Sequence, residues 1–270
     1  MSSIAALDRA LIRVAGPDAR PFLQGLLTQD VQAMDAPLYA GLLTPQGKVS
    51  ADMILWPTDG AVMIDADPAR AAELVRRLTL YKLRSAVDIT DASAEARVLW
   101  CDTPFEGAAA DPRFPDGALG YRALGPALGD APASDADLDR RRIALGVPDL
   151  ARDADQDEVF ALEALFEELH GVDFHKGCFV GQENVSRMKR RATTRRKFCP
   201  ISFDGPALRH GAPIHGGGAE IGSVRTGVAG RALALLRLDR ALAAGSALEC
   251  EGRVIRLDPP DWLIPPEETR

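Results

Sequence analysis

The stretch HKGCFVGQENVSRMKRR, residues 175–191, sets a lone cysteine in a glycine-containing loop ahead of a basic segment. Glycine permits a tight backbone path, so Gly177 and Gly181 indicate a turn around Cys178. From Gln182 onward the residues are compatible with a helix, and the basic residues lie in its C-terminal half, where they suit the helix dipole. The stretch therefore predicts a loop that carries Cys178 and leads into a helix.

Two interpretations of Cys178 follow from its chemistry. A thiol just before a helix N-terminus, with Lys176 nearby, is favoured as the reactive thiolate. Alternatively, the side chain is a small hydrophobic group packed in a turn. No histidine and carboxylate can be assigned to a cysteine–histidine triad, so a hydrolase is disfavoured. The residues alone leave both interpretations of the cysteine open.

The composition is that of a globular protein. The chain has 270 residues, 46% hydrophobic and 26% charged, which fits one large domain or two to three small ones. A net charge of −7 disfavours general nucleic-acid binding. The basic run RMKRRATTRRK, residues 187–197, has no interleaved aromatics and indicates a solvated helix face or an anchor for carboxylates. The four cysteines have no Cys-x-x-Cys spacing, which disfavours a disulfide framework, a zinc ribbon or an iron–sulfur cluster held by this chain alone.

The N-terminal residues and the hydropathy predict the compartment. In MSSIAALDRALIRVAG, Asp8 and Arg9 interrupt the apolar residues, so the segment has no signal-peptide core. No window approaches the roughly 18 uninterrupted apolar residues that span a bilayer. We therefore expect a cytoplasmic protein without a membrane partner.

Apolar periodicity predicts an α+β unit in about the first 90 residues. Strands are expected at residues 39–43, 49–56 and 61–66, with a tight turn between the last two. A helix with a charged outer face is expected over residues 68–83. Strand alternation over 49–56 would place Asp52 on one face with Ser50 and Ile54, and would place Val49, Ala51, Met53 and Leu55 toward the core.

In the second half of the chain, the expected secondary structure changes from helices to short strands. Helices are expected near residues 134–145 and over VFALEALFEEL, residues 159–169. After residue 196, short apolar stretches such as KFCPISF and RALALLRL alternate with glycine and proline. This pattern indicates a small β-barrel at the C-terminus.

The motif KGCFVGQE, residues 176–183, resembles the Lys-Gly-Cys-Tyr-x-Gly-Gln-Glu signature of the YgfZ/GcvT-like family of folate-binding proteins, with Phe179 in the place of the tyrosine. The resemblance extends over nearly the whole chain. It includes RVAGPDARPFLQGLLTQDV at 13–31, LLTPQGKVSADMIL at 42–55, YKLRSAVDI at 81–89, RRIALGVPD at 141–149 and GVDF at 171–174.

The resemblance implies an α+β, GcvT-like fold, in which three subdomains form a cloverleaf around a central folate channel and the last is a β-barrel. The boundaries we expect are 1–93 for the N-terminal subdomain, 94–194 for a second α+β subdomain with the motif, and 195–270 for the barrel, the first two being interleaved in space. The implied cofactor is tetrahydrofolate or a one-carbon derivative. The implied role is iron–sulfur cluster biogenesis or repair, linked to tRNA modification, with iron–sulfur proteins or assembly factors as partners.

The resemblance also implies site residues. Cys178 is the expected functional thiol, with Lys176 beside it. The expected folate-binding residues are Asp52, Lys176, Gly177, Gly181, Gln182 and Glu183, with Asp52 on one side of the channel and Lys176 and Gly177 closing the other. No metal ligands are expected.

The alternative function is that of a folate-dependent aminomethyltransferase or demethylase similar to the glycine-cleavage T protein. Those enzymes have two adjacent aspartates on the strand after a Gly-Gly hairpin. This chain keeps Asp52 and has Ala51 beside it. We therefore favour a folate-binding assembly protein and leave open whether it catalyses one-carbon or redox chemistry.

Overall fold

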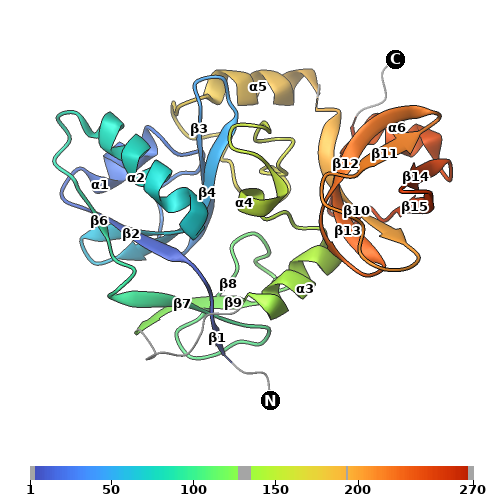
Figure 1. Ribbon diagram of the computed structural model, residues 1–270. Helices are drawn as coiled ribbons and strands as arrows, with labels where there is room; N and C mark the ends of the chain where they lie inside the picture. The colour runs from blue at the N-terminus through green and yellow to red at the C-terminus, as the bar shows by residue number, and fades with distance from the viewer. Residues whose placement is uncertain (1–3, 127–134, 193, 267–270) are drawn as a thin grey trace.

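The computed structural model describes residues 4–126, 135–192 and 194–266 of the chain. Three units surround a central region that contains helix α4 (Figure 1). Two units are built on separate antiparallel sheets, and the third is a closed barrel. Within these described ranges, no helix is long and apolar enough to span a bilayer.

The first unit is a five-stranded sheet with the order β3-β4-β5-β2-β6. The predicted meander and the predicted helix after it are confirmed. Helices α1 and α2 pack on one face of the sheet, which buries apolar side chains of β4 beneath them. The elements are β2 (Ala10–Ala15), α1 (Ala19–Gln24), β3 (Leu38–Leu43), β4 (Val49–Thr58), β5 (Ala61–Ala66), α2 (Pro68–Lys82) and β6 (Asp88–Asp91).

A β-bulge near the start of β4 changes the predicted alternation. Leu42 pairs with Ala51 and Leu43 pairs with Val49, so Ser50 is the extra residue. Ser50 consequently points toward α2, where it contacts Arg77, and Val49 turns to the opposite face. The predicted placement of Ser50 and Val49 is therefore wrong. Beyond the bulge the alternation holds, with Asp52 and Ala51 on opposite faces.

The second unit is a four-stranded sheet with the order β1-β7-β9-β8. Its first strand comes from the start of the chain, so the N-terminal segment crosses from one sheet to the other. Helix α3 then leads toward the barrel (Figure 1). The predicted helix near 134–145 is confirmed from Ala136; residues 127–134 lie outside the described ranges. The elements are β1 (Ala5–Ala6), β7 (Ala96–Cys101), β8 (Ala109–Ala110), β9 (Tyr121–Pro126), α3 (Ala136–Leu145) and α4 (Leu150–Asp153).

The third unit is a closed barrel with the order β10-β13-β12-β11-β14-β15, as the alternating apolar stretches predict. Helix α5 lies between the first unit and the barrel (Figure 1). The structure adds strand β11 and helix α6, which the sequence pattern did not indicate. The elements are α5 (Gln182–Arg191), β10 (Arg196–Phe203), β11 (Pro213–Gly216), β12 (Ala219–Val228), β13 (Arg231–Arg237), α6 (Leu238–Ala244), β14 (Leu248–Cys250) and β15 (Arg253–Leu257).

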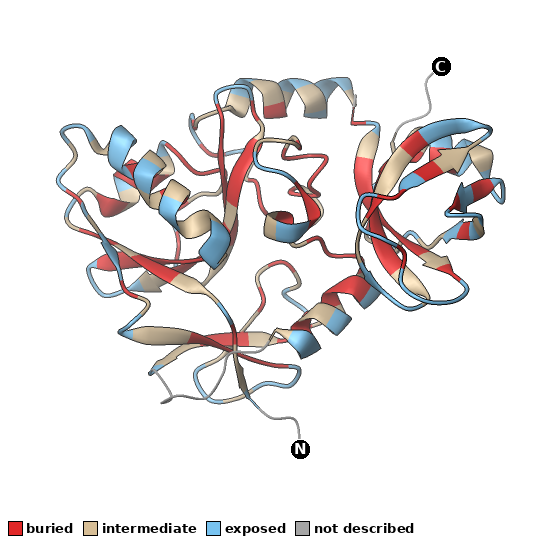
Figure 2. Ribbon diagram, viewed as in Figure 1, coloured by how far each residue is buried: buried red, intermediate tan, exposed pale blue. Residues whose placement is uncertain are grey.

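Residues 161–170 form consecutive turns, and Phe160 before them pairs with Lys48 in an isolated bridge, so the predicted helix over residues 159–169 is wrong. Leu165 has a left-handed backbone with φ of 63°, which breaks a regular helix. The segment is buried on almost every side, and Figure 2 shows buried backbone concentrated in this central region. Phe166 packs on Tyr39 with ring centroids 5.2 Å apart, and Gly41 leaves room for its ring. Tertiary packing thus overrides the helical propensity of these residues.

Candidate functional site

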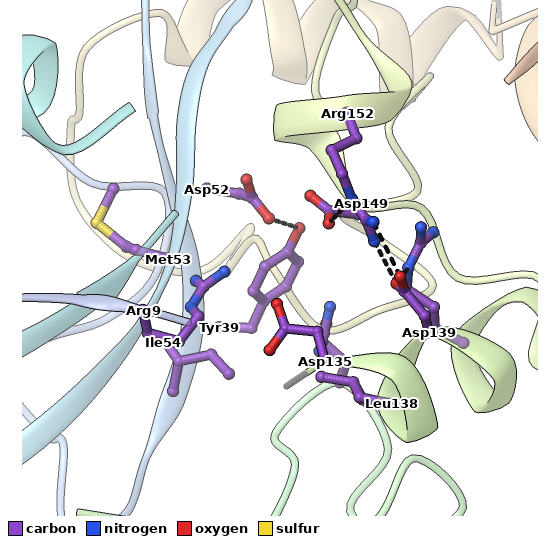
Figure 3. Close-up of a pocket in the computed structure, with 12 residues that line it drawn as sticks. Arg9, Tyr39, Asp52, Met53, Ile54, Asp135, Leu138, Asp139, Asp149 and Arg152 are labelled. Atoms are coloured by element: carbon purple, nitrogen blue, oxygen red, sulfur yellow. Dashed lines mark hydrogen bonds and ion pairs between the residues drawn. The ribbon is translucent and has the colours of Figure 1, made fainter. Parts of the chain in front are cut away.

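Asp52 on β4 lines a cavity between the first sheet and helices α3 and α4 (Figure 3). Its Oδ2 accepts a hydrogen bond of 3.0 Å from the hydroxyl of Tyr39 on β3. Within the described residues, Oδ1 accepts no hydrogen bond, so it is an open acceptor. Burial raises the pKa of Asp52, and the nearby carboxylate of Asp149 adds to the rise, whereas Arg9 and Arg113 oppose it.

The cavity is small in this conformation. Its volume is about 40 Å³, and a cavity needs about 10–15 Å³ to hold one water molecule, so it has room for roughly three. Apolar side chains of Ile54 and Leu138 form part of the wall beside the charged groups. A larger ligand therefore requires side chains at the mouth to move apart.

A buried chain of ion pairs supports the cavity wall. Asp65 accepts from Arg9 and from Arg122, whose Nη1 lies 3.3 Å from Oδ2. Asp111 accepts from Arg122 at 2.7 Å and from Arg113 at 2.9 Å. The side chains of Asp65 and Asp111 are fully buried. Burial alone would raise the pKa of Asp111, but the two guanidinium groups outweigh it and hold the pKa well below its usual range.

This network has an excess of positive charge at the cavity. It contains three guanidinium groups and two carboxylates, and the ionised carboxylate of Asp52 would balance the remaining charge. Arg113 also lies over the ring of Tyr39, 5.6 Å from the centroid. The residues around Asp52 thus hold it beside two cations and one hydroxyl donor.

The opposite wall has its own ion pairs. Asp149 accepts from the backbone of Ala151 as the N-cap of α4 and pairs with Arg152 at 2.7 Å. Arg142 on α3 pairs with Asp139 at 2.7 Å and with the buried Asp153 at 3.0 Å. Burial would raise the pKa of Asp149, but Arg142 and Arg152 outweigh it, so the pKa is lowered. An ionised Asp149 therefore faces Asp52, whose pKa is raised.

Lys176 lies away from this cavity. Its Nζ donates to the carbonyl oxygens of Gln24, Leu27 and Gln29. Burial lowers the pKa of Lys176 to about 8, while Asp30 and Asp173 oppose the change. The structure does not place Lys176 opposite Asp52, because its donors are used by the turn after α1.

Cys178 is exposed in the loop before α5, and the other three cysteines are buried. The predicted helix is confirmed and begins at Gln182. Asn184, near the start of α5, donates a hydrogen bond of 2.6 Å to the carbonyl of Gln46 at the tip of the β3–β4 hairpin. The thiol predicted to be functional is accessible to solvent, and the helix after its loop is bonded to this hairpin.

The other predicted site residues are structural or exposed in this conformation. Gly181 has φ of +81°, and a Cβ there would lie 2.6 Å from the carbonyl oxygen of Thr44. Gly177 and Glu183 are exposed, and Gln182 begins α5. Of the seven predicted residues that the structure describes, Asp52 is the one that lines the cavity.

Sequence reasoning missed Tyr39, Arg9 and Arg113. Pairing of β3 with β4 brings Tyr39 beside Asp52, a relation that strand register shows and residue type does not. Arg113 lies in a loop of a segment rich in Pro, Gly and Asp, which gave no periodic signal. Among the residues that the structure describes, no group of three or more His, Cys, Asp or Glu side chains could hold a metal ion.

Comparison with known proteins identifies relatives of this chain in sequence and in fold. The barrel matches the family described as CAF17, C-terminal beta-barrel domain, over residues 195–264. A Neurospora crassa protein named iron-sulfur cluster assembly factor IBA57 homolog, mitochondrial, is 33% identical over 237 residues, covering 74% of this chain and 54% of that protein. The human protein named iron-sulfur cluster assembly factor IBA57, mitochondrial, is 31% identical over 299 residues, covering 94% of this chain and 83% of the human protein. The chain belongs to the IBA57 family.

Lengths differ within the IBA57 family. The chain spans about half the length of the fungal relatives that it matches. The relatives are named as mitochondrial, so our prediction of a cytoplasmic protein is wrong. That prediction tested for an apolar secretory signal, and mitochondrial targeting does not use one.

The fold comparison agrees with the sequence resemblance at a coarse level. The crystal structure of glycine cleavage system aminomethyltransferase T from Bartonella henselae has a TM-score of 0.77, covering 97% of this chain and 86% of that chain at 16% identity. The predicted GcvT-like α+β fold with a C-terminal β-barrel is confirmed. At this identity the likeness concerns the fold alone.

Proposed function

We propose that this chain is a tetrahydrofolate-binding protein that assists iron–sulfur cluster biogenesis or repair, with Cys178 as its functional thiol. The assembly role follows from membership of the IBA57 family, whose relatives are named assembly factors. The observation that carries the folate part is the open carboxylate oxygen of Asp52 in a partly closed cavity of a GcvT-like fold.

The groups around Asp52 suit a reduced pterin. Such a ring presents several N–H donors, and Asp52 supplies an acceptor for them. Tyr39 and Arg113 orient and balance the carboxylate. Bound folate supplies one-carbon or redox chemistry, and the protein binds and orients it. The exposed Cys178 offers its thiol to the iron–sulfur protein or assembly factor with which the chain works.

Ala51 takes the place that a second aspartate holds in a T-protein type of transferase. Ala51 is 5% exposed and packs in the core under α1 and α2. A second carboxylate at this position would point into apolar surroundings and away from the cavity. The chain therefore presents a single carboxylate to a ligand from this part of β4.

Calorimetric titration with tetrahydrofolate, and with its formyl and methyl derivatives, tests the folate part directly. We expect the wild-type chain to bind and Asp52→Asn to bind about tenfold or more weakly, because loss of one charge-assisted hydrogen bond costs roughly 1.5–3 kcal/mol. Asp204→Asn, at an exposed site in the barrel, is the matched control. Absence of binding by the wild type, or equal affinity in Asp52→Asn, would contradict the proposed site.

A further inference from the structure

Lys176 buries its ammonium group against three backbone carbonyls. Nζ donates to Gln24 at 2.8 Å, to Leu27 at 2.6 Å and to Gln29 at 2.9 Å. Lys176 is 7% exposed. An ammonium group has three N–H donors, and each has an acceptor here. No donor is left for the thiol of Cys178 or for a ligand.

The three carbonyls belong to the end of α1 and the turn after it. Carbonyls in the last turn of a helix lack N–H partners within the helix. A cation at this end also complements the helix dipole. Lys176 therefore caps α1 from a position 152 residues further along the chain than Gln24.

Further hydrogen bonds join the same turn to the segment before Lys176. The hydroxyl of Thr28 donates to the carbonyl of Gly171 at 2.6 Å, and the amide of Asp173 donates to the carbonyl of Thr28 at 3.0 Å. The side-chain amide of Gln29 donates to the carbonyl of His170 at 2.8 Å. Residues 24–29 and 170–176 thus form one hydrogen-bonded clasp.

Cys178 lies between two buried anchors. Lys176 precedes it, and Phe179 follows it with 8% exposure and a ring centroid 5.2 Å from Nζ. Gly177 and Cys178 between them are exposed. With both flanking side chains buried, the direction in which the loop presents the thiol depends on the clasp.

We propose that Lys176 is the positioning residue for Cys178. It acts through the carbonyls of residues 24–29, which hold the loop that presents the thiol. This inference rests on the proposed function of Cys178 and gives Lys176 a role other than folate binding or direct activation of the thiol. A partner protein would then meet a thiol in a defined orientation.

Hydrogen exchange and thiol alkylation on the full chain test this role. Lys176→Met removes the three donors and keeps most of the side-chain length. We expect amide exchange in residues 24–29 and 170–181 to become faster, on the order of tenfold, with little change in the barrel. Lys82→Met is the control, because Lys82 lies in the last turn of α2 and pairs with the exposed Asp88.

The rate at which iodoacetamide alkylates Cys178 below about pH 8, where wild-type Lys176 keeps its ammonium form, separates positioning from other roles. In Lys176→Met this rate should rise several-fold, because a freed loop lets the reagent approach from more directions. A residue that contributes stability alone would leave the rate unchanged, and a residue that stabilises the thiolate directly would lower it when removed. Either result overturns the proposal.

Gln29→Ala provides a second route to the same test. It removes the bond to His170 without emptying a buried site, so it carries the test if Lys176→Met does not fold. We expect the same two segments to exchange faster, by a smaller factor, and unchanged exchange in residues 170–181 would contradict the clasp. Full cellular function of Cys178→Ser would defeat the proposed function of the thiol, whereas these exchange results depend on the clasp alone.

Discussion

Cys178 differs from the other three cysteines in its exposure to solvent. Cys101, Cys199 and Cys250 are buried, and Cys178 is exposed. Burial raises the pKa of the Cys199 thiol to about 12, and it also raises the pKa of Cys250. Because the thiolate is the reactive species, both effects disfavour reaction at the buried sites.

We expect iodoacetamide to label Cys178 first in the native chain near neutral pH. Mass spectrometry of peptides after short exposure measures the labelled fraction at each site. Cys178→Ser should remove the fast phase and leave the slow labelling of the buried thiols. Equal rates at all four cysteines would count against a distinct environment for Cys178.

Asp52 links the site to a pH dependence of stability. Its folded pKa is raised above the ordinary value of 3.8, chiefly by burial. Such a group contributes stability below about pH 3.8, and this contribution is lost as the pH rises through the folded pKa. Asn at this position has no charge to bury. We therefore expect Asp52→Asn to become more stable relative to the wild type between pH 4 and pH 7, as measured by urea unfolding.

Asp204→Asn serves as the control for that comparison, because Asp204 is exposed in the barrel. Its difference from the wild type should change little with pH. A stability difference for Asp52→Asn that is also flat between the two pH values would show that burial of this carboxylate costs nothing.

Local sequence signals correctly predict most of the helices and strands. The turn Thr58-Asp59-Gly60 and the apolar alternation around it correctly predicted β4 and β5, and Pro68 opens α2. The same rules failed where distant residues decide the backbone. Residues 159–169 have helix-forming residues but fill the centre of the molecule mostly as turns, and the bulge at Ser50 depends on pairing with β3.

A glycine in the motif loop allows a test of how tightly this loop packs on the β3–β4 hairpin. Gly181 and Gly218 both have φ of +81°, but a Cβ on Gly181 would lie 2.6 Å from the carbonyl of Thr44, and one on Gly218 would meet nothing within 4 Å. Both alanine variants should lose about 1–2 kcal/mol from the left-handed backbone. Gly181→Ala should lose at least about 1 kcal/mol more, because the hairpin must move. Urea unfolding measures both, and equal losses would show that the hairpin yields easily.

The sequence places some of the predicted site residues correctly and fails for others. Asp52 could be placed from strand alternation, and Cys178 from its glycine-rich loop. The role of Lys176 could not, because its three acceptors come from a turn near the N-terminal end of the chain, far from Lys176 in the sequence. Residue type shows which groups can react, and the fold determines what each one contacts.

Buried ion pairs join the first two units of the molecule. Arg9 precedes β2, Asp65 belongs to β5 of the first sheet, and Arg122 belongs to β9 of the second sheet. The network therefore fixes the two sheets around the cavity. A buried ion pair contributes little relative to an apolar replacement, but removal of one partner leaves a buried charge without compensation.

We expect Asp111→Asn to lower the free energy of unfolding by about 3–5 kcal/mol, because Arg113 and Arg122 lose their shared carboxylate. Urea unfolding measures the loss. Acidification should mimic it, since a lowered folded pKa gives stability that is present above about pH 3.8 and is lost as the pH falls through the folded pKa. A loss as small as that of the exposed Asp204→Asn would show that the network does not hold the sheets.

In the proposed function, Cys178 and the Asp52 cavity act together in iron–sulfur cluster assembly. The most direct measurement is the activity of a cluster-dependent enzyme in cells that lack this protein and carry one variant each. We predict that the wild type and Lys82→Met restore the activity, whereas Cys178→Ser and Asp52→Asn fail to restore it although both accumulate as folded protein. Full restoration by Cys178→Ser or by Asp52→Asn would contradict this joint role.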